Sequence, residues 1–198
     1  MIVDPERGAE LVREGGTVAY PTETVYGLAA DARSREAVTR LRLLKGCGPD
    51  HGLSVLVDAP ARLDEWAPDC PEAARILAGR HWPGPLTLVV PVPAGSLSAV
   101  ATPLGVGFRC SSHPTASELA RRAGFPLVAT SCNRSGGTPC ADAPEIAEVF
   151  GPELAVVGGS PVGGGPPSTV VAISKAGDLE LLRQGEIPFD LLLSGGST

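Results

Sequence analysis

The chain has 198 residues, of which 43% are hydrophobic and 19% are charged, and its formal net charge is −6. A chain of this length buries an ordinary core as one domain, so it needs no disulfide or structural metal to fold. Its apolar runs stay well short of the ~20 residues of a membrane-spanning helix, and its acidic balance disfavours a surface built throughout to hold nucleic acid.

The cysteines and the first residues bear on the compartment. The five cysteines are odd in number and never spaced C-x-x-C, so we expect reduced thiols and no zinc site. The opening MIVDPERGAELV lacks a basic start, an apolar segment and a small-residue cleavage site. We therefore expect a cytoplasmic protein without a membrane partner.

The first half of the chain predicts helices and strands in alternation. A helix over 5–14 begins at the pair Asp4-Pro5 and stops at a glycine pair. A second helix, over 35–45, is capped by Ser34. The other elements expected in this half are strands over 17–20, 53–57 and 86–92 and a helix over 71–80. The last of these strands is almost wholly apolar, which predicts burial on both faces.

The second half continues this pattern. Expected here are strands over 105–110, 126–131, 153–159, 168–173 and 179–185 and helices over 115–124 and 143–151. Because some strands follow one another directly, we predict an α/β (α+β) fold in which helices flank a twisted mixed β-sheet. We expect one domain over 5–187, a mobile loop over 158–168 that covers a site, and a C-terminal tail over 188–198.

Four stretches share one design, in which an apolar strand runs into a loop rich in hydroxyls, glycine or proline. They are AYPTETVYG (19–27), LTLVVPVPAGS (86–96), VATSCNRSGG (128–137) and GGGPPSTVV (163–171). Loops at the strand ends of an open sheet converge on a crevice, and their N–H groups and hydroxyls suit phosphate or carboxylate. Each loop taken alone also fits an ordinary turn or helix cap.

Three cations are candidates for such a crevice: Lys45, Arg109 and Arg183. Lys45 also suits the negative end of its own helix, where a cation gains about 0.3–1 kcal/mol, and Arg109 could simply reach solvent. The sequence has no GxxxxGK[ST] loop, no GxGxxG after a strand and no GxSxG elbow. The residues alone therefore indicate an anion site without naming its chemistry.

Seven blocks of sequence resemble the Sua5/YrdC family, the threonylcarbamoyl-adenylate synthases, in their order and spacing. They are PTETVYGLAADA (21–32), LLKGCGPDHGLSVLV (43–57), HWPGPLTLVVP (81–91), VGFRCSSHP (106–114), PLVATSCNRSG (126–136), STVVAI (168–173) and LLRQGEI (181–187). The resemblance looks like the short form of the family and implies a YrdC/RibB-like fold with a large basic cavity.

The resemblance also implies a reaction and its partners. L-threonine, bicarbonate or CO2, and ATP with Mg²⁺ would give L-threonylcarbamoyl-adenylate and pyrophosphate. The product would pass to a transferase complex that modifies adenosine 37 of tRNAs, the t6A modification. Catalysis of this kind depends on positioning and charge neutralisation. Neither a covalent protein nucleophile nor a metal held by the protein itself is expected.

The matching motifs carry residue roles with them. The residues expected around L-threonine are Thr22, Arg109, Ser131 and Ser168, with Arg109 in a bidentate pair with the carboxylate. The residues expected to bind ATP are Lys45, Asn133 and Arg183. Of all these, Lys45 and Arg109 are expected to matter most.

The block after Lys45 departs from the family pattern KxRP, because Cys47 and Gly48 stand where arginine and proline are usual. Loss of a charged phosphate contact costs about 1.5–3 kcal/mol, and Arg134 is a candidate replacement. Two alternatives remain open: a family paralog that binds nucleotide without turnover, and an RNA-binding module with weak tRNA contacts. The low aromatic content, 4% of residues, disfavours the second.

Overall fold

The computed structural model describes residues 1–49, 51–95, 97–159 and 163–193. Its strands are β1 (Ile2–Val3), β2 (Val18–Tyr20), β3 (Gly27–Ala29), β4 (Ser54–Leu56), β5 (Leu86–Val90), β6 (Val106–Arg109), β7 (Leu127–Ser131), β8 (Ala155–Val157), β9 (Thr169–Ile173) and β10 (Leu179–Arg183). Its helices are α1 (Pro5–Arg13), α2 (Arg35–Lys45), α3 (Arg62–Trp66), α4 (Glu72–His81), α5 (Pro114–Ala123), α6 (Ala143–Phe150) and α7 (Phe189–Leu193).

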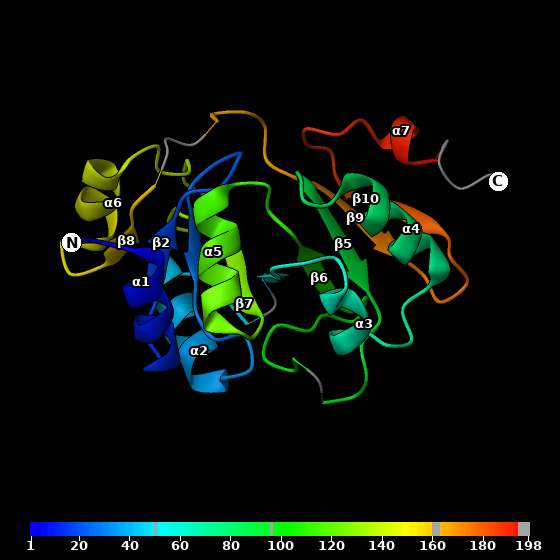
Figure 1. Ribbon diagram of the computed structural model, residues 1–198, viewed down its shortest axis with the longest axis horizontal. Helices are drawn as coiled ribbons and strands as arrows, with labels where there is room; N and C mark the ends of the chain where they lie inside the picture. The colour runs from blue at the N-terminus through cyan, green and yellow to red at the C-terminus, as the bar shows by residue number, and fades with distance from the viewer. Residues whose placement is uncertain (50, 96, 160–162, 194–198) are drawn as a thin grey trace.

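The strands form one ten-stranded sheet in the order β1-β8-β2-β3-β7-β4-β6-β5-β9-β10. β8 pairs in parallel with β1 and β2, β4 with β6, and β5 with β9, whereas the other neighbours are antiparallel. The predicted mixed sheet is therefore confirmed. In Figure 1 the β8 end lies beside the N-terminus, and the β10 end lies beside α4 and α7.

Local sequence sets the ends of the helices. Asp4 caps α1 and Ser34 caps α2, because each side chain accepts the backbone N–H three residues ahead, at 2.8 and 3.2 Å. α2 ends at Gly46, whose φ of 70° is left-handed and suits glycine. Lys45 is therefore fixed as the last helical residue, directly before the loop that leads to β4.

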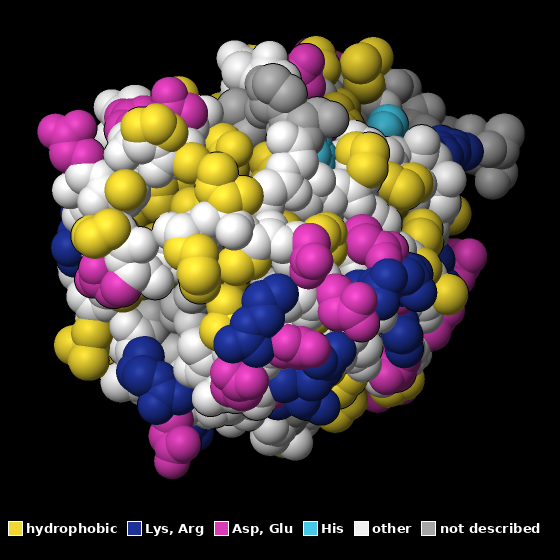
Figure 2. All heavy atoms as spheres, turned by 60° about the vertical axis from the view of Figure 1, so that its left-hand side comes forward, with side chains coloured by type: hydrophobic (Ala, Val, Ile, Leu, Met, Phe, Trp, Pro, Cys, Tyr) yellow, Lys and Arg dark blue, Asp and Glu magenta, His cyan; other side chains and the backbone are white. Residues whose placement is uncertain are grey.

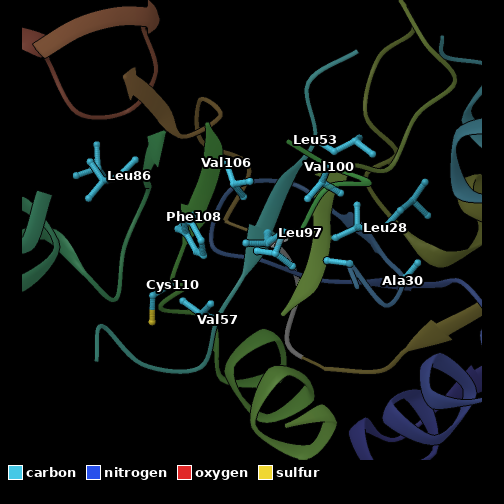
Figure 3. Close-up of a cluster of buried hydrophobic side chains, with 14 of the residues drawn as sticks. Leu28, Ala30, Leu53, Val57, Leu86, Leu97, Val100, Val106, Phe108 and Cys110 are labelled. Carbon is cyan, nitrogen blue, oxygen red and sulfur yellow. The ribbon is translucent and has the colours of Figure 1, made fainter. Parts of the chain in front are cut away.

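Helices cover the two faces of the sheet in different places. On one face, apolar residues of α1 and α5 pack against Leu127 of β7 and neighbouring residues of β2 and β8. On the other face, α2, α3, α4 and α6 pack against residues of opposite parity in the strands. Figure 3 shows part of this second layer, where Leu86, Val106 and Phe108 of the central strands lie in one apolar cluster. All five residues of β5 are buried, as predicted.

Four short elements escaped prediction: β1, β3, α3 and α7. The strand β3 has the sequence Gly-Leu-Ala, which lacks β-branched and aromatic residues and so carries little strand propensity. It forms because it pairs with β2 on one side and β7 on the other. Tertiary pairing, rather than local preference, makes this segment a strand.

The predicted C-terminal tail is wrong over residues 189–193. They form α7, and its Leu192 is 1% exposed because it packs into the main apolar cluster. Residues 194–198 and residues 160–162 of the predicted mobile loop lie outside the described residues. All five cysteines are described and free, and within the described ranges no helix combines the length and apolar character that a membrane crossing needs.

Candidate active site

A cavity of about 640 Å³ opens on the sheet face that also carries α1 and α5. Its floor consists of Ser54 of β4, Thr87 and Val89 of β5, Gly107 of β6, Ala129 of β7 and Val170 of β9. Residues of the opposite parity, such as Leu88 and Phe108, belong to the core beneath. Because side chains alternate along a strand, the same strands present a cavity on one side and apolar packing on the other.

Five of the seven predicted site residues line this cavity. They are Thr22, Arg109, Ser131, Ser168 and Arg183. They come from the turn after β2, the ends of β6, β7 and β10, and the position before β9. Strand ends that are far apart in sequence therefore meet at one site, as the pattern of strands and polar loops predicts.

One of the four converging loops was assigned wrongly. Residues 91–95, which follow β5, line a different cavity of about 590 Å³ beside β9 and β10. Residues 102–105 border both cavities and lie between them. β5 lies between β6 and β9 in the sheet, so the loop after it lies next to β9 and β10. The order of the strands, which the sequence does not state, decides the matter.

The segment before β9 lies directly over the turn after β2. A Cβ placed on Gly163 would stand 2.5 Å from the carbonyl oxygen of Glu23, so only glycine permits this approach. Pro167 and Ser168, further along the same segment, line the cavity. The described part of the predicted covering loop therefore contacts the PTET turn.

Arg109 is held by the residues after β2. Its Nη2 donates to Oε1 of Glu23 at 3.0 Å and to Oγ1 of Thr24 at 3.1 Å. Its Nε is buried and has no hydrogen-bond partner within the described residues. A buried donor without an acceptor is costly, but a nitrogen that water cannot reach is also closed to a ligand, so a ligand would meet the rest of the guanidinium of Arg109, which lines the cavity.

Arg183 and Ser168 form the opposite polar side of the cavity. The guanidinium of Arg183 donates to the carbonyl oxygen of Ser168 at 2.9 and 3.2 Å and to its hydroxyl at 3.2 Å. The Ser168 hydroxyl also contacts the Thr87 hydroxyl at 2.9 Å. Burial, and then the positive charge of Arg109, lower the pKa of Arg183 from its ordinary value. The positive charges of Arg109 and Arg183 therefore repel one another across the cavity.

The two remaining lining residues are fixed by local hydrogen bonds. The Thr22 hydroxyl donates to the carbonyl of Val25 at 2.6 Å and accepts the N–H groups of Thr24 and Val25, each at 3.2 Å. The Ser131 hydroxyl donates to Oδ1 of Asn133 at 2.5 Å. Thr22 therefore closes the PTET turn on itself, and Ser131 marks the point where β7 leaves the sheet.

Lys45 and Asn133 lie outside the cavity lining. The Lys45 ammonium donates to the carbonyls of Ser131 and Asn133 at 2.5 and 3.0 Å and to Oδ1 of Asn133 at 3.2 Å. Lys45 is 2% exposed, and burial lowers its pKa below the ordinary value. The Asn133 amide donates to Arg134 and Gly137 carbonyls at 2.7 and 2.9 Å. In this arrangement both side chains fix the end of β7, and their contact with ATP stays a prediction.

The loop that lacks the family arginine is held from the helix before it. Nη1 of Arg42 donates to the carbonyls of Gly48 and His51, both at 2.7 Å. Arg134, the candidate replacement, instead donates to the carbonyl of Leu44 and stacks over Phe150 at 5.2 Å. It therefore ties α2 to α6 and is not one of the residues that line the cavity.

Sequence reasoning missed several residues at the site: Tyr20, Tyr26, His51 and Thr87, which line the cavity, and Glu23, which holds Arg109. Two of them had a signal in the sequence. Thr87 is the one hydroxyl in an otherwise apolar strand, and Glu23 is an acid three residues after a buried strand end. The place of Tyr20 is seen only in the structure. Its side chain packs so closely on Gly27 that a Cβ at that glycine would lie 2.8–3.0 Å from it.

The cavity offers little to a resident metal ion. The described residues contain no group of three or more His, Cys, Asp and Glu side chains that could hold one, and no described Asp or Glu lines the cavity. Protein-bound Mg²⁺ usually takes one or two carboxylates together with phosphates and waters. These lining residues therefore do not form a metal site by themselves.

A family model and several known proteins match most of this chain. Residues 10–185 match the model of the Sua5/YciO/YrdC family, whose description reads "Telomere recombination". A Bacillus subtilis (strain 168) protein named threonylcarbamoyl-AMP synthase is 39% identical over 190 residues, which are 93% of this chain and 54% of that protein. A Thiobacillus denitrificans protein of the same name is 36% identical over 166 residues, 82% of this chain and 87% of that protein.

A Pyrococcus abyssi relative, 37% identical, is also covered over 54% of its length, so the chain spans about half of these longer relatives. The crystal structure of P. abyssi Sua5 complexed with L-threonine is 32% identical, with a TM-score of 0.90 over 99% of this chain and 61% of that one. The E. coli YciO structure, 21% identical, shares the fold with a TM-score of 0.79 over 93% of both chains. With the matched model covering residues 10–185, the chain belongs to the Sua5/YciO/YrdC family.

Proposed function

We propose that the chain is an L-threonylcarbamoyladenylate synthase, a nucleotidyltransferase that joins L-threonine, bicarbonate or CO2 and the AMP part of ATP, with release of pyrophosphate. The observation that carries this proposal is the convergence of Thr22, Arg109, Ser131 and Ser168 on one cavity. Relatives of this chain bear the name of that enzyme, and the similar Sua5 structure holds L-threonine.

Threonine would bind through its carboxylate at Arg109. Arg109 lines the cavity, and Glu23 and Thr24 hold its Nη2 in place, so a carboxylate that enters would meet a fixed guanidinium and accept short, charge-assisted bonds from it. The hydroxyls of Ser131 and Ser168 stand on either side of the same cavity. They would hold the remaining polar groups of the amino acid and fix the direction of its amine.

ATP would place its phosphates toward Arg183, the second cation of the cavity. Mg²⁺ would enter as part of the MgATP substrate, held by phosphate oxygens, because the described lining supplies no carboxylate. Lys45 and Asn133 fix the turn after β7 and would influence ATP through it. Direct contact of these two side chains with ATP requires that this turn opens when the nucleotide binds.

The reaction needs two bond-forming steps and no covalent protein intermediate. The threonine amine attacks the carbon of CO2 and loses a proton, which gives a carbamate. A carbamate oxygen then attacks the α-phosphorus of ATP, and the bond from that phosphorus to the bridging oxygen breaks to release pyrophosphate. Arg109 and Arg183 contribute because they are fixed beside the negative charges of the threonine carboxylate and of the ATP phosphates, where charge shifts during the reaction. The product would serve a transferase complex that forms t6A in tRNA.

The test is pyrophosphate release by the purified chain with bicarbonate, MgATP and L-threonine. We expect release only when threonine is present, and the absence of threonine-dependent release would contradict the proposal.

Cys47→Arg is the informative second variant, because it restores the family arginine at a half-buried loop position. If only this variant turns over, the chain is a paralog that has lost the reaction. Comparable rates in both proteins would exclude that alternative.

A further inference from the structure

Glu23 is a carboxylate next to the proposed threonine site that is not among the residues expected to touch substrate. Glu23 does not line the cavity but stands behind Arg109 and joins it in an ion pair of 3.0 Å. The Arg109 and Glu23 side chains are 12% and 17% exposed. A pair so shielded from water is screened less by salt and held more firmly than a surface pair.

Glu23 is itself held by a third residue. Its second carboxylate oxygen, Oε2, accepts a hydrogen bond from the Ser111 hydroxyl, and that hydroxyl accepts the backbone N–H of His113 at 3.2 Å. The contacts form a chain from the loop after β6, through Glu23, to the guanidinium at the end of β6. Burial alone would raise the pKa of Glu23, but the charge of Arg109 and the Ser111 hydrogen bond outweigh it, so the pKa lies below its ordinary value.

This chain of contacts fixes the plane of the Arg109 guanidinium. Both contacts on the Glu23 and Thr24 side use Nη2, whereas the buried Nε has no partner within the described residues. A guanidinium is planar, so fixing Nη2 also fixes the direction of Nε. Without Glu23 the plane could turn, and Arg109 and Arg183 would face each other with less compensating negative charge.

We propose that Glu23 is the positioning residue of the threonine site: with Ser111 as its anchor, it fixes the plane of the Arg109 guanidinium at the cavity wall, so that the guanidinium is oriented to receive the substrate carboxylate. This inference rests on the proposed function. Glu23 acts through Arg109 and touches no substrate itself. Its effect should therefore appear only with ligands that carry a carboxylate.

The test is titration calorimetry of L-threonine and of L-threoninol, which keeps the amine and hydroxyl but has no carboxylate. In Glu23→Gln we expect the Kd of L-threonine to rise about tenfold, the size of one weakened charged hydrogen bond. The Kd of L-threoninol should change by less than about twofold. Glu118→Gln is the matched control, because it breaks exposed ion pairs with Arg121 and Arg122 by the same substitution and should leave both constants unchanged.

Each other outcome has a distinct meaning. If wild-type protein does not bind L-threonine, the proposed function falls and this inference falls with it. If wild type binds L-threonine and Glu23→Gln binds it equally well, only the inference is overturned, as it is when both ligands weaken together. Should Glu23→Gln fail to fold, Ser111→Ala takes its place. It should weaken L-threonine alone by about threefold, and an unchanged Kd would overturn the inference.

Discussion

Two cations that look alike in the sequence have opposite surroundings in the structure. Arg109 and Lys45 each stand at the end of a regular element, before a loop. Arg109 keeps a buried donor without a partner in the described part of the chain, whereas the Lys45 ammonium makes three hydrogen bonds to residues at the end of β7. An ammonium has three donors, so Lys45 is satisfied within the protein. Of the two, Arg109 is the cation that lines the cavity.

Lys45→Met tests this structural role. The substitution keeps the length and removes the charge, which leaves two carbonyls and the Asn133 Oδ1 with fewer donors at a site where Lys45 is 2% exposed. We expect a loss of about 2 kcal/mol in the free energy of unfolding, measured by urea denaturation. Lys175→Met, at the only other lysine of the chain and an exposed one, is the control and should change stability by less than about 0.5 kcal/mol. Equal stability in the two variants would contradict the assignment.

At the scale of the elements, strand order and parity build the site. The cavity takes residues of one parity from β5 and β6, and the core takes the other, so a shift of one residue in either strand would exchange the two sets. Alternation is readable in the sequence, which is why the strands carrying Arg109 and Ser131 were predicted. Strand order is not readable, which is why the loop after β5, a strand that lies beside β9, was assigned to the wrong cavity.

Two glycine substitutions separate close packing from chain flexibility. Gly27→Ala places a methyl 2.8–3.0 Å from atoms of the Tyr20 side chain, which is 2% exposed, so the ring or the strand must shift. We expect a loss of about 1–3 kcal/mol. Gly79→Ala, on the exposed side of α4 with no atom within 4 Å of the new methyl, should gain about 0.5–1 kcal/mol. Urea denaturation measures both, and a stabilised Gly27→Ala would show that the ring can yield.

At the scale of the whole molecule, segments from the beginning and from the end of the described chain both pack onto the rest of the domain. β1, from the first residues, pairs with β8, and α7 returns near the end of the described chain to bury Leu192. On the face seen in Figure 2, basic and acidic side chains are interspersed rather than gathered by sign. This face therefore gives no support to an RNA-binding module, in keeping with the acidic net charge of −6.

Truncation tests where the domain ends. A chain that stops at residue 187 loses α7 and the buried Leu192, so we expect it to be less stable by about 2 kcal/mol and to melt several degrees lower. A chain that stops at residue 193 keeps α7 and serves as the control. Calorimetry measures both melting temperatures. If the shorter chain melts with the full-length protein, the boundary predicted at 187 is correct and α7 contributes no stability.

The sequence by itself determined most of the regular elements and the mixed sheet, because caps and apolar periodicity are local or repeat along the chain. Of the residues that line the cavity, its strand ends indicated Arg109 and Arg183, and the resemblance to the family implied Thr22, Ser131 and Ser168. Only the tertiary structure decided the surroundings of Lys45, the partner of Arg109 and the cavity to which each loop belongs. Those features depend on contacts between segments far apart in sequence: Lys45 meets the end of β7, and Glu23 meets Arg109. Local pattern records which side chains are present at a strand end, whereas strand order and direction decide which of them face one another.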